Sequence, residues 1–125
     1  MYKKKKRYYK EKYVWKVVIQ ILAGLRALHR VNIVHRDMKS ANIFLSKDGR
    51  AKLGDFNVSE IEGENLTNMQ IGTPLYSSPE VFKNVEYSIK SDIWSLGCAA
   101  YEMCQLKPPF QADSMDGLFK KVCKG

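Results

Sequence analysis

The sequence predicts an α+β fold that is mainly helical, with short β-hairpins around one polar loop. Two long stretches, 13–30 and 88–106, are apolar on most faces and have the length of helices. Three short apolar runs, at 31–34, 43–45 and 51–53, have the length of strands. A polar cluster separates the first two runs, so we expect a loop that strands hold at both ends. Catalytic residues are often placed on such loops.

The first long stretch, 13–30, predicts a helix about 27 Å long. Apolar side chains occupy most of its faces, so we expect burial on several sides and a role in bracing the polar loop that follows. His29 is expected to be a residue of the helix end rather than a catalyst, because no base–nucleophile pair lies beside it.

The polar loop carries a carboxylate, an ammonium group and a carboxamide within six positions, at Asp37, Lys39 and Asn42. The second and third apolar runs are joined by residues 46–50, which include Asp48-Gly49. This pair favours a tight reversal, because glycine readily adopts the left-handed backbone that such turns need. The predicted hairpin returns Asp55 towards Asp37 and Asn42, and this proximity is the main structural inference.

The second half of the chain predicts a polar, irregular surface loop at 58–71 and then three helices. Pro79 permits the first turn of a short helix through Lys83. Ser88 or Ser91 can cap the next helix, which the prolines at 108 and 109 stop. A last helix carries Leu118, Phe119 and Val122, with Ser114 as its candidate cap.

The 125 residues make one domain at most. No run of apolar residues is long enough for a membrane span, and no apolar run follows the basic start as in a secretory signal. The three cysteines, Cys98, Cys104 and Cys123, have neither metal-site spacing nor an even count. We therefore expect a reducing, intracellular setting.

The positive charge is concentrated at the start of the chain, where residues 1–12 hold seven Lys or Arg and one Glu, or +6 of the net +8. Basic residues interleaved with tyrosines could contact nucleic acid, an anionic membrane or an acidic partner. We interpret the segment as a solvated helix end and linker, and nucleic acid is not the partner we expect.

Four motifs in order resemble a protein kinase. His35-Arg36-Asp37-x-Lys39-x-x-Asn42, followed by Asp55-Phe56, is similar to the catalytic loop and metal-binding motif. Residues 72–76 and 78–80 resemble the segment that closes the activation loop, and 91–97 resembles the central helix of the large lobe. The amino-acid sequences of segments 43–49 and 90–98 are most similar to those of the NIMA-related (NEK) serine/threonine kinases. The resemblance covers roughly 13–124.

The resemblance implies transfer of the γ-phosphate of ATP to Ser or Thr hydroxyls of a protein substrate, with Mg²⁺. Asp37 would accept the substrate proton, and Lys39 would contact the transferred phosphate, as in the serine/threonine class. Asn42 and Asp55 offer oxygen ligands to Mg²⁺. Phe44 would lie under the adenine. Asp37 could instead be a structural carboxylate that caps backbone amides of the loop. This interpretation is less favoured because Lys39, Asn42 and Asp55 accompany Asp37 at the expected spacing.

The resemblance also implies supporting roles. Arg36 would grip a phosphate on an activation loop, and Thr73 would bond Asp37 and Lys39. Thr67 is the nearest candidate for activating phosphorylation, because Met69 stands where many NEK kinases have Ser or Thr. Asn57 replaces the expected glycine after Asp-Phe, and asparagine tolerates left-handed backbone. Further roles are implied for His35 and Phe56 in the apolar stack between lobes, for Asp92 in holding the catalytic-loop backbone, and for Glu80 in pairing with a later arginine.

No glycine-rich nucleotide loop and no V-A-I-K strand occurs in the sequence. We therefore expect residues 1–12 to form a basic segment and 13–125 a partial kinase domain, a large lobe with its small lobe absent. Its family resemblance implies a cytoplasmic protein that can associate with the cytoskeleton or nucleus. An alternative is a non-catalytic binding module, which the missing small lobe favours. The retained Asp37, Lys39, Asn42 and Asp55 favour an origin in an active kinase.

Overall fold

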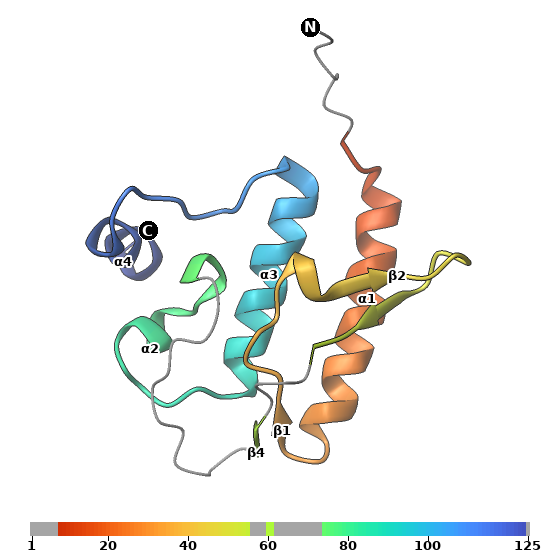
Figure 1. Ribbon diagram of the computed structural model, residues 1–125, viewed down its shortest axis with the longest axis horizontal. Coiled ribbons are helices and arrows are strands. Elements are labelled where there is room, and N and C mark those ends of the chain that lie inside the picture. The colour runs from red at the N-terminus through yellow and green to blue at the C-terminus, as the bar shows by residue number, and fades with distance from the viewer. Residues whose placement is uncertain (1–7, 56–59, 62–73, 125) are drawn as a thin grey trace, which may run out of the picture.

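A computed structural model describes residues 8–55, 60–61 and 74–124 (Figure 1). The elements in chain order are α1 (Glu11–His29), β1 (Ile33–Val34), the 3-10 turn η1 (Ser40–Asn42), β2 (Ile43–Leu45), β3 (Ala51–Leu53), β4 (Glu60–Ile61), the 3-10 turn η2 (Pro74–Tyr76), α2 (Pro79–Phe82), α3 (Ile89–Gln105) and α4 (Met115–Lys124). The predicted mainly helical α+β architecture is confirmed. No helix in these ranges combines the length and apolarity needed to span a membrane.

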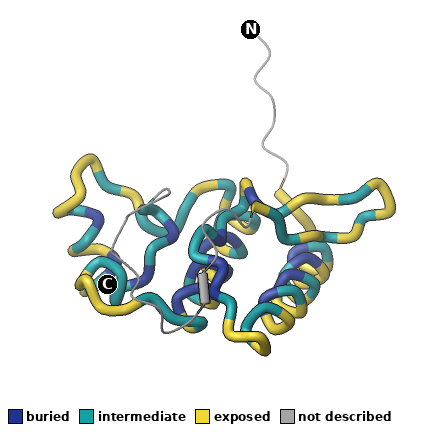
Figure 2. The backbone as a smooth tube through the Cα atoms, turned by 60° about the horizontal axis from the view of Figure 1, so that its bottom comes forward, coloured by how far each residue is buried: buried dark blue, intermediate teal, exposed yellow. Residues whose placement is uncertain are grey.

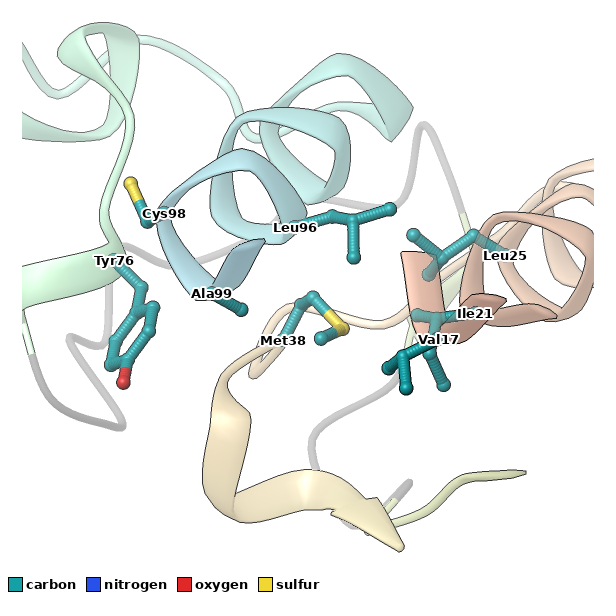
Figure 3. Packing of buried hydrophobic residues seen from close by; sticks show 8 residues of the cluster. All are labelled: Val17, Ile21, Leu25, Met38, Tyr76, Leu96, Cys98 and Ala99. Carbon is teal, nitrogen blue, oxygen red and sulfur yellow. The ribbon is translucent and has the colours of Figure 1, made fainter. Parts of the chain in front are cut away.

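Helices α1 and α3 lie side by side and enclose the core, and the β2–β3 hairpin packs across α1 (Figures 1 and 2). Figure 3 shows Met38 of the polar loop between the side chains of the two helices. The core consists of Val17, Ile21 and Leu25 from α1, Leu96, Cys98 and Ala99 from α3, and Met38 and Tyr76 from the connecting segments. Because Met38 lies within this core, the residues on either side of it are held by the packing of both helices.

The expectation that α1 is buried on several sides is wrong for this chain. Val14, Val17, Ile21 and Leu25 are buried and share one face at helical spacing. Other apolar side chains point to solvent, with Trp15 57% and Ile19 61% exposed. The reason is that α3 and β3 provide most of the packing partners of α1 within the described residues, and they cover a single face.

The predicted hairpin is confirmed residue for residue. Strands β2 and β3 are antiparallel, with Ile43 opposite Leu53 and Leu45 opposite Ala51. Gly49 has φ +75°, which glycine adopts without steric cost, and the Gly49 amide donates to Ser46 O at 2.8 Å. The hairpin is also fastened to α1, because Gln20 Oε1 accepts the Ala51 amide at 2.6 Å.

The first strand is shorter than predicted, and a further strand was missed. Strand β1 begins at Ile33, whereas Val31 is 62% exposed and belongs to the turn after α1. β1 pairs with β4 in an antiparallel arrangement. The irregular interpretation of 58–71 is therefore wrong at Glu60–Ile61, since backbone pairing imposes a strand that polar composition does not indicate. The other residues of that stretch lie outside the described ranges.

Both predicted caps act on α3. Ser88 is the N-cap residue, and a capping box joins its side chain and backbone to Ser91, whose hydroxyl accepts the Ser88 amide at 3.2 Å. The helix ends at Gln105, and its C-cap residue Leu106 is left-handed with φ 56°, two positions before the first of the two prolines. Helix α2 starts at Pro79 as predicted. Ser114 Oγ accepts the Gly117 amide at the start of α4.

Candidate active site

Three polar side chains of the loop between β1 and β2 are joined by direct contacts. Lys39 Nζ lies 3.1 Å from Asp37 Oδ2. Asn42 Nδ2 donates to the Asp37 carbonyl oxygen at 2.7 Å and to Asp37 Oδ2 at 3.1 Å. Asn42 is 4% exposed, so its amide is a fixed donor that orients the Asp37 carboxylate. The structure thus brings together Asp37, Lys39 and Asn42, as the sequence predicted.

The hairpin brings the backbone before Asp55 back to this loop. The Gly54 amide donates to Asn42 O at 3.0 Å, and Gly54 O lies 2.9 Å from His35 Nε2. Asp55 follows directly, with an exposed side chain and a left-handed backbone at φ 61°. Because both polar groups of Gly54 are bound to the loop, the start of Asp55 is fixed beside it.

The ring of His35 links Asp37 to Gly54, and its hydrogen bonds define its tautomer. His35 is fully buried. The Asp37 amide donates to His35 Nδ1 at 3.2 Å, so Nδ1 carries no proton. Nε2 is then the protonated nitrogen that donates to Gly54 O. His35 therefore acts as a structural bridge between the loop and the segment that carries Asp55.

Asp92 of α3 binds the backbone of the loop through its carboxylate, which is fully buried. Its Oδ2 accepts the His35 amide at 2.9 Å and His29 Nε2 at 2.8 Å. Its Oδ1 accepts the Arg36 amide at 3.0 Å and the Tyr87 hydroxyl at 2.7 Å. Four donors satisfy this buried charge, which would otherwise be costly. The predicted hold of Asp92 on the loop backbone is confirmed, and His29 lies at the helix end as expected.

Phe44 was predicted to lie under an adenine, and it is 56% exposed on β2. Its ring packs against the backbone of Gly54, where an added Cβ would lie 2.6 Å from Phe44 Cε2. A glycine at this position therefore leaves room for the Phe44 ring at the residue just before Asp55. The ring offers an exposed apolar face next to the polar cluster.

A second polar cluster, which the sequence did not reveal, is formed by Ser40, Tyr76 and Glu102. Ser40 Oγ donates to Glu102 Oε2 at 2.6 Å and lies 3.0 Å from the Tyr76 hydroxyl, which also donates to Glu102. Burial and the hydrogen bond to Glu102 raise the pKa of Tyr76 to about 12. This cluster ties η1 to η2 and α3. These residues lie 26 to 62 positions apart, so no local pattern signals their contact.

Glu80 has a partner within the described part of the chain. Ser91 Oγ donates to Glu80 Oε1 at 2.7 Å. Partial burial raises the pKa of Glu80, but the bond from Ser91 and a backbone hydrogen bond outweigh it, so the pKa is lowered on balance. The contact fastens α2 to the first turn of α3.

The donor set suits a hard cation. Asn42 uses its amide nitrogen for Asp37, which leaves the side-chain oxygen as the atom that can ligate a metal. With the carboxylate of Asp55 it provides oxygen ligands of the kind Mg²⁺ takes together with phosphates. Among the residues that the structure describes, no group of three or more His, Cys, Asp or Glu side chains could hold a metal by itself. A cation here would therefore depend on oxygens of a bound ligand.

Arg36 is the loop residue that contacts both Asp92 of α3 and Tyr87, which lies just before that helix. Its backbone is left-handed, with φ 67°, and its guanidinium carbon lies 5.9 Å from the centre of the Tyr87 ring. The predicted regulatory positions Thr67 and Thr73, together with Phe56, Asn57 and Met69, lie outside the described residues.

Comparison with known proteins identifies the class. A family model described as "Protein kinase domain" matches residues 1–125. The chain therefore belongs to the protein kinase domain family. Within this family it is similar to serine/threonine-protein kinases of the NEK group, as the motifs indicated. It is 46% identical over 109 residues to serine/threonine-protein kinase Nek3 of Mus musculus, and 48% identical over 109 residues to Nek5 of Homo sapiens. It is 44% identical over 118 residues to Nek3 of Oryza sativa subsp. japonica.

These matches cover most of this chain and a small part of each relative. They span 86%, 85% and 94% of the chain, and 21%, 15% and 20% of the three relatives. Protein kinases generally use ATP and Mg²⁺ and act on protein substrates. The matched region is the one that carries Asp37, Asn42 and Asp55.

Proposed function

We propose that this chain supplies the catalytic loop and the metal ligands of an ATP-dependent serine/threonine protein kinase. The observation that carries the proposal is the joined cluster of Asp37, Lys39 and Asn42, with the Gly54 backbone bound to the same loop. Phosphoryl transfer needs a positioned hydroxyl and neutralised phosphate charge more than covalent chemistry. This cluster has the groups for both tasks.

Each residue has a role that its contacts support. Asp37 accepts a hydrogen bond from the substrate hydroxyl, because Asn42 and Lys39 hold its carboxylate in place. Lys39 reaches the transferred phosphate and stabilises its developing charge. The side-chain oxygen of Asn42 and the carboxylate of Asp55 would hold Mg²⁺, which would supply positive charge to neutralise the phosphates of ATP. Phe44 provides the apolar surface below the adenine.

The substrate is a Ser or Thr hydroxyl of another protein. The kinase to which this chain belongs acts inside the cell. Arg36, Thr67 and Thr73 are proposed to regulate the site or position the substrate. Residues 1–12 are proposed to form a basic segment ahead of the kinase region, which begins at 13.

The proposal is tested by equilibrium binding of ATP to the chain with and without Mg²⁺. Binding should depend on Mg²⁺, and Asp55→Ala should weaken it at least tenfold. Asp113→Ala is the matched control, because Asp113 is an exposed carboxylate that lies before α4. Binding that ignores Mg²⁺, or that Asp55→Ala leaves unchanged, would contradict the proposal.

Phosphate transfer by these 125 residues alone should be weak or absent. The glycine-rich loop and the lysine that hold the ATP phosphates in kinases do not occur in this sequence. The measurement is transfer from labelled ATP to a generic basic protein. Robust turnover that Asp37→Ala abolishes would show that this prediction is wrong.

A further inference from the structure

Tyr87 contacts the catalytic loop directly at the Arg36 side chain and indirectly through Asp92 of α3, although no motif singled it out. It precedes Ser88, the N-cap residue of α3, and is partly buried. Its hydroxyl donates to Asp92 Oδ1 at 2.7 Å, and the same oxygen accepts the Arg36 amide at 3.0 Å. The guanidinium carbon of Arg36 lies 5.9 Å from the centre of the Tyr87 ring, within the range of a cation–π contact.

Arg36, which Tyr87 contacts, has a backbone conformation that surrounding contacts must stabilise. Arg36 has φ 67°, in the left-handed region that is unfavourable for a residue with a long side chain. Such a conformation persists only where surrounding contacts enforce it. Asp37 follows directly, so the direction in which the chain leaves Arg36 sets where the Asp37 carboxylate lies.

We propose that Tyr87 is a positioning residue for the catalytic loop. Its hydroxyl fixes the Asp92 oxygen that receives the Arg36 amide, and its ring supports the Arg36 guanidinium, so the strained backbone before Asp37 has one conformation. Burial keeps the Tyr87 hydroxyl protonated by raising its pKa, so it remains a donor to Asp92. The catalytic meaning of this arrangement rests on the role proposed above for Asp37, whereas the positioning of the loop does not.

Two substitutions separate the hydroxyl from the ring. Tyr87→Phe removes the bond to Asp92 and keeps the ring under Arg36, whereas Tyr87→Leu removes both. Tyr101→Phe is the matched control, because Tyr101 is an exposed tyrosine on α3, the helix that follows Tyr87. The measurement is hydrogen exchange, read by NMR, of three consecutive amides. The His35 and Arg36 amides are bound to Asp92, and the Asp37 amide is bound to His35.

Tyr87→Leu should raise the exchange rates of these three amides at least tenfold, while the core amides of Ile21 and Leu25 in α1 change less than twofold. Tyr87→Phe should give a smaller rise, because the ring still supports Arg36. Tyr101→Phe should change none of them. Unchanged loop amides in Tyr87→Leu would overturn the proposal, and so would an equal rise in the α1 amides, which indicates general loss of stability.

The exchange experiment uses no nucleotide, so its result is independent of whether the chain binds Mg²⁺·ATP. A selective rise at the loop amides supports the positioning role even if the ATP-binding test fails. In a chain that does transfer phosphate, Tyr87→Leu should lower kcat about tenfold and leave the KM for ATP within twofold. A change confined to KM would contradict action through Asp37.

Discussion

Asp92→Asn should destabilise the chain by about 2–4 kcal/mol, because the buried carboxylate accepts four hydrogen bonds and an amide cannot accept all four. The new NH₂ group must replace one oxygen. In one orientation it faces the Arg36 amide, and in the other it faces the His35 amide. Neither main-chain donor can turn round to accept.

The magnitude follows from two contributions. One buried main-chain donor left unpaired costs about 1–3 kcal/mol. Loss of the negative charge weakens the remaining bonds, since a hydrogen bond to a charged group is worth roughly twice a neutral one. The smaller cost of burying a neutral amide offsets part of this loss.

The assay is urea unfolding followed by tryptophan fluorescence, with the free energy extrapolated to zero denaturant. Trp94 is a suitable reporter because it lies on α3 and stacks on Phe110. Asp113→Asn is the control, because this carboxylate is exposed, and it should change the free energy of unfolding by less than about 0.5 kcal/mol. A loss below about 0.5 kcal/mol for Asp92→Asn would refute the reasoning that this group holds the loop.

Three other perturbations have definite expected results. Ser88→Ala should lower the free energy of unfolding by about 1 kcal/mol in the same assay, because α3 loses its N-cap; an unchanged value would contradict the cap's role. Gly54→Ala should displace the Phe44 ring, since the new Cβ would lie 2.6 Å from it, and the ring's NMR shifts should move; unmoved shifts would contradict this packing. Burial and Glu102 raise the pKa of Tyr76 to about 12, so folding favours its neutral form. This stability is present below the ordinary tyrosine pKa of about 10 and is lost as the pH rises towards 12. Urea unfolding between pH 9 and 12 should show this loss, and Tyr76→Phe should reduce it.

The backbone course of the loop and hairpin that carry Asp37, Asn42 and Asp55 could be predicted because its signals are local. The Asp48-Gly49 reversal fixes the hairpin, and the hairpin fixes that Gly54 returns to Asn42. Ser88 and Ser91 were both named as candidate caps, and the structure uses both in one capping box. In each case a few neighbouring residues determine the backbone, so the sequence alone suffices.

The missed features depend on packing between distant segments. Tyr87 contacts Arg36 across more than fifty positions, and Glu102 contacts Ser40 across 62. Helical periodicity predicted α1 but could not show which apolar residues of that helix find a partner, so the exposure of Trp15 was not foreseen. Strand β4 was missed because two paired residues in polar surroundings leave no pattern.

The central claim is that Asp37, Asn42 and Asp55 share one metal–nucleotide site. The most direct measurement replaces Mg²⁺ with paramagnetic Mn²⁺ in complex with ATP and records the broadening of backbone amide signals. We predict selective broadening at these three residues and at Gly54, absent in Asp55→Ala and retained in Asp113→Ala. Broadening at Asn42 or Asp55 alone, or spread evenly over the chain, would contradict a shared site.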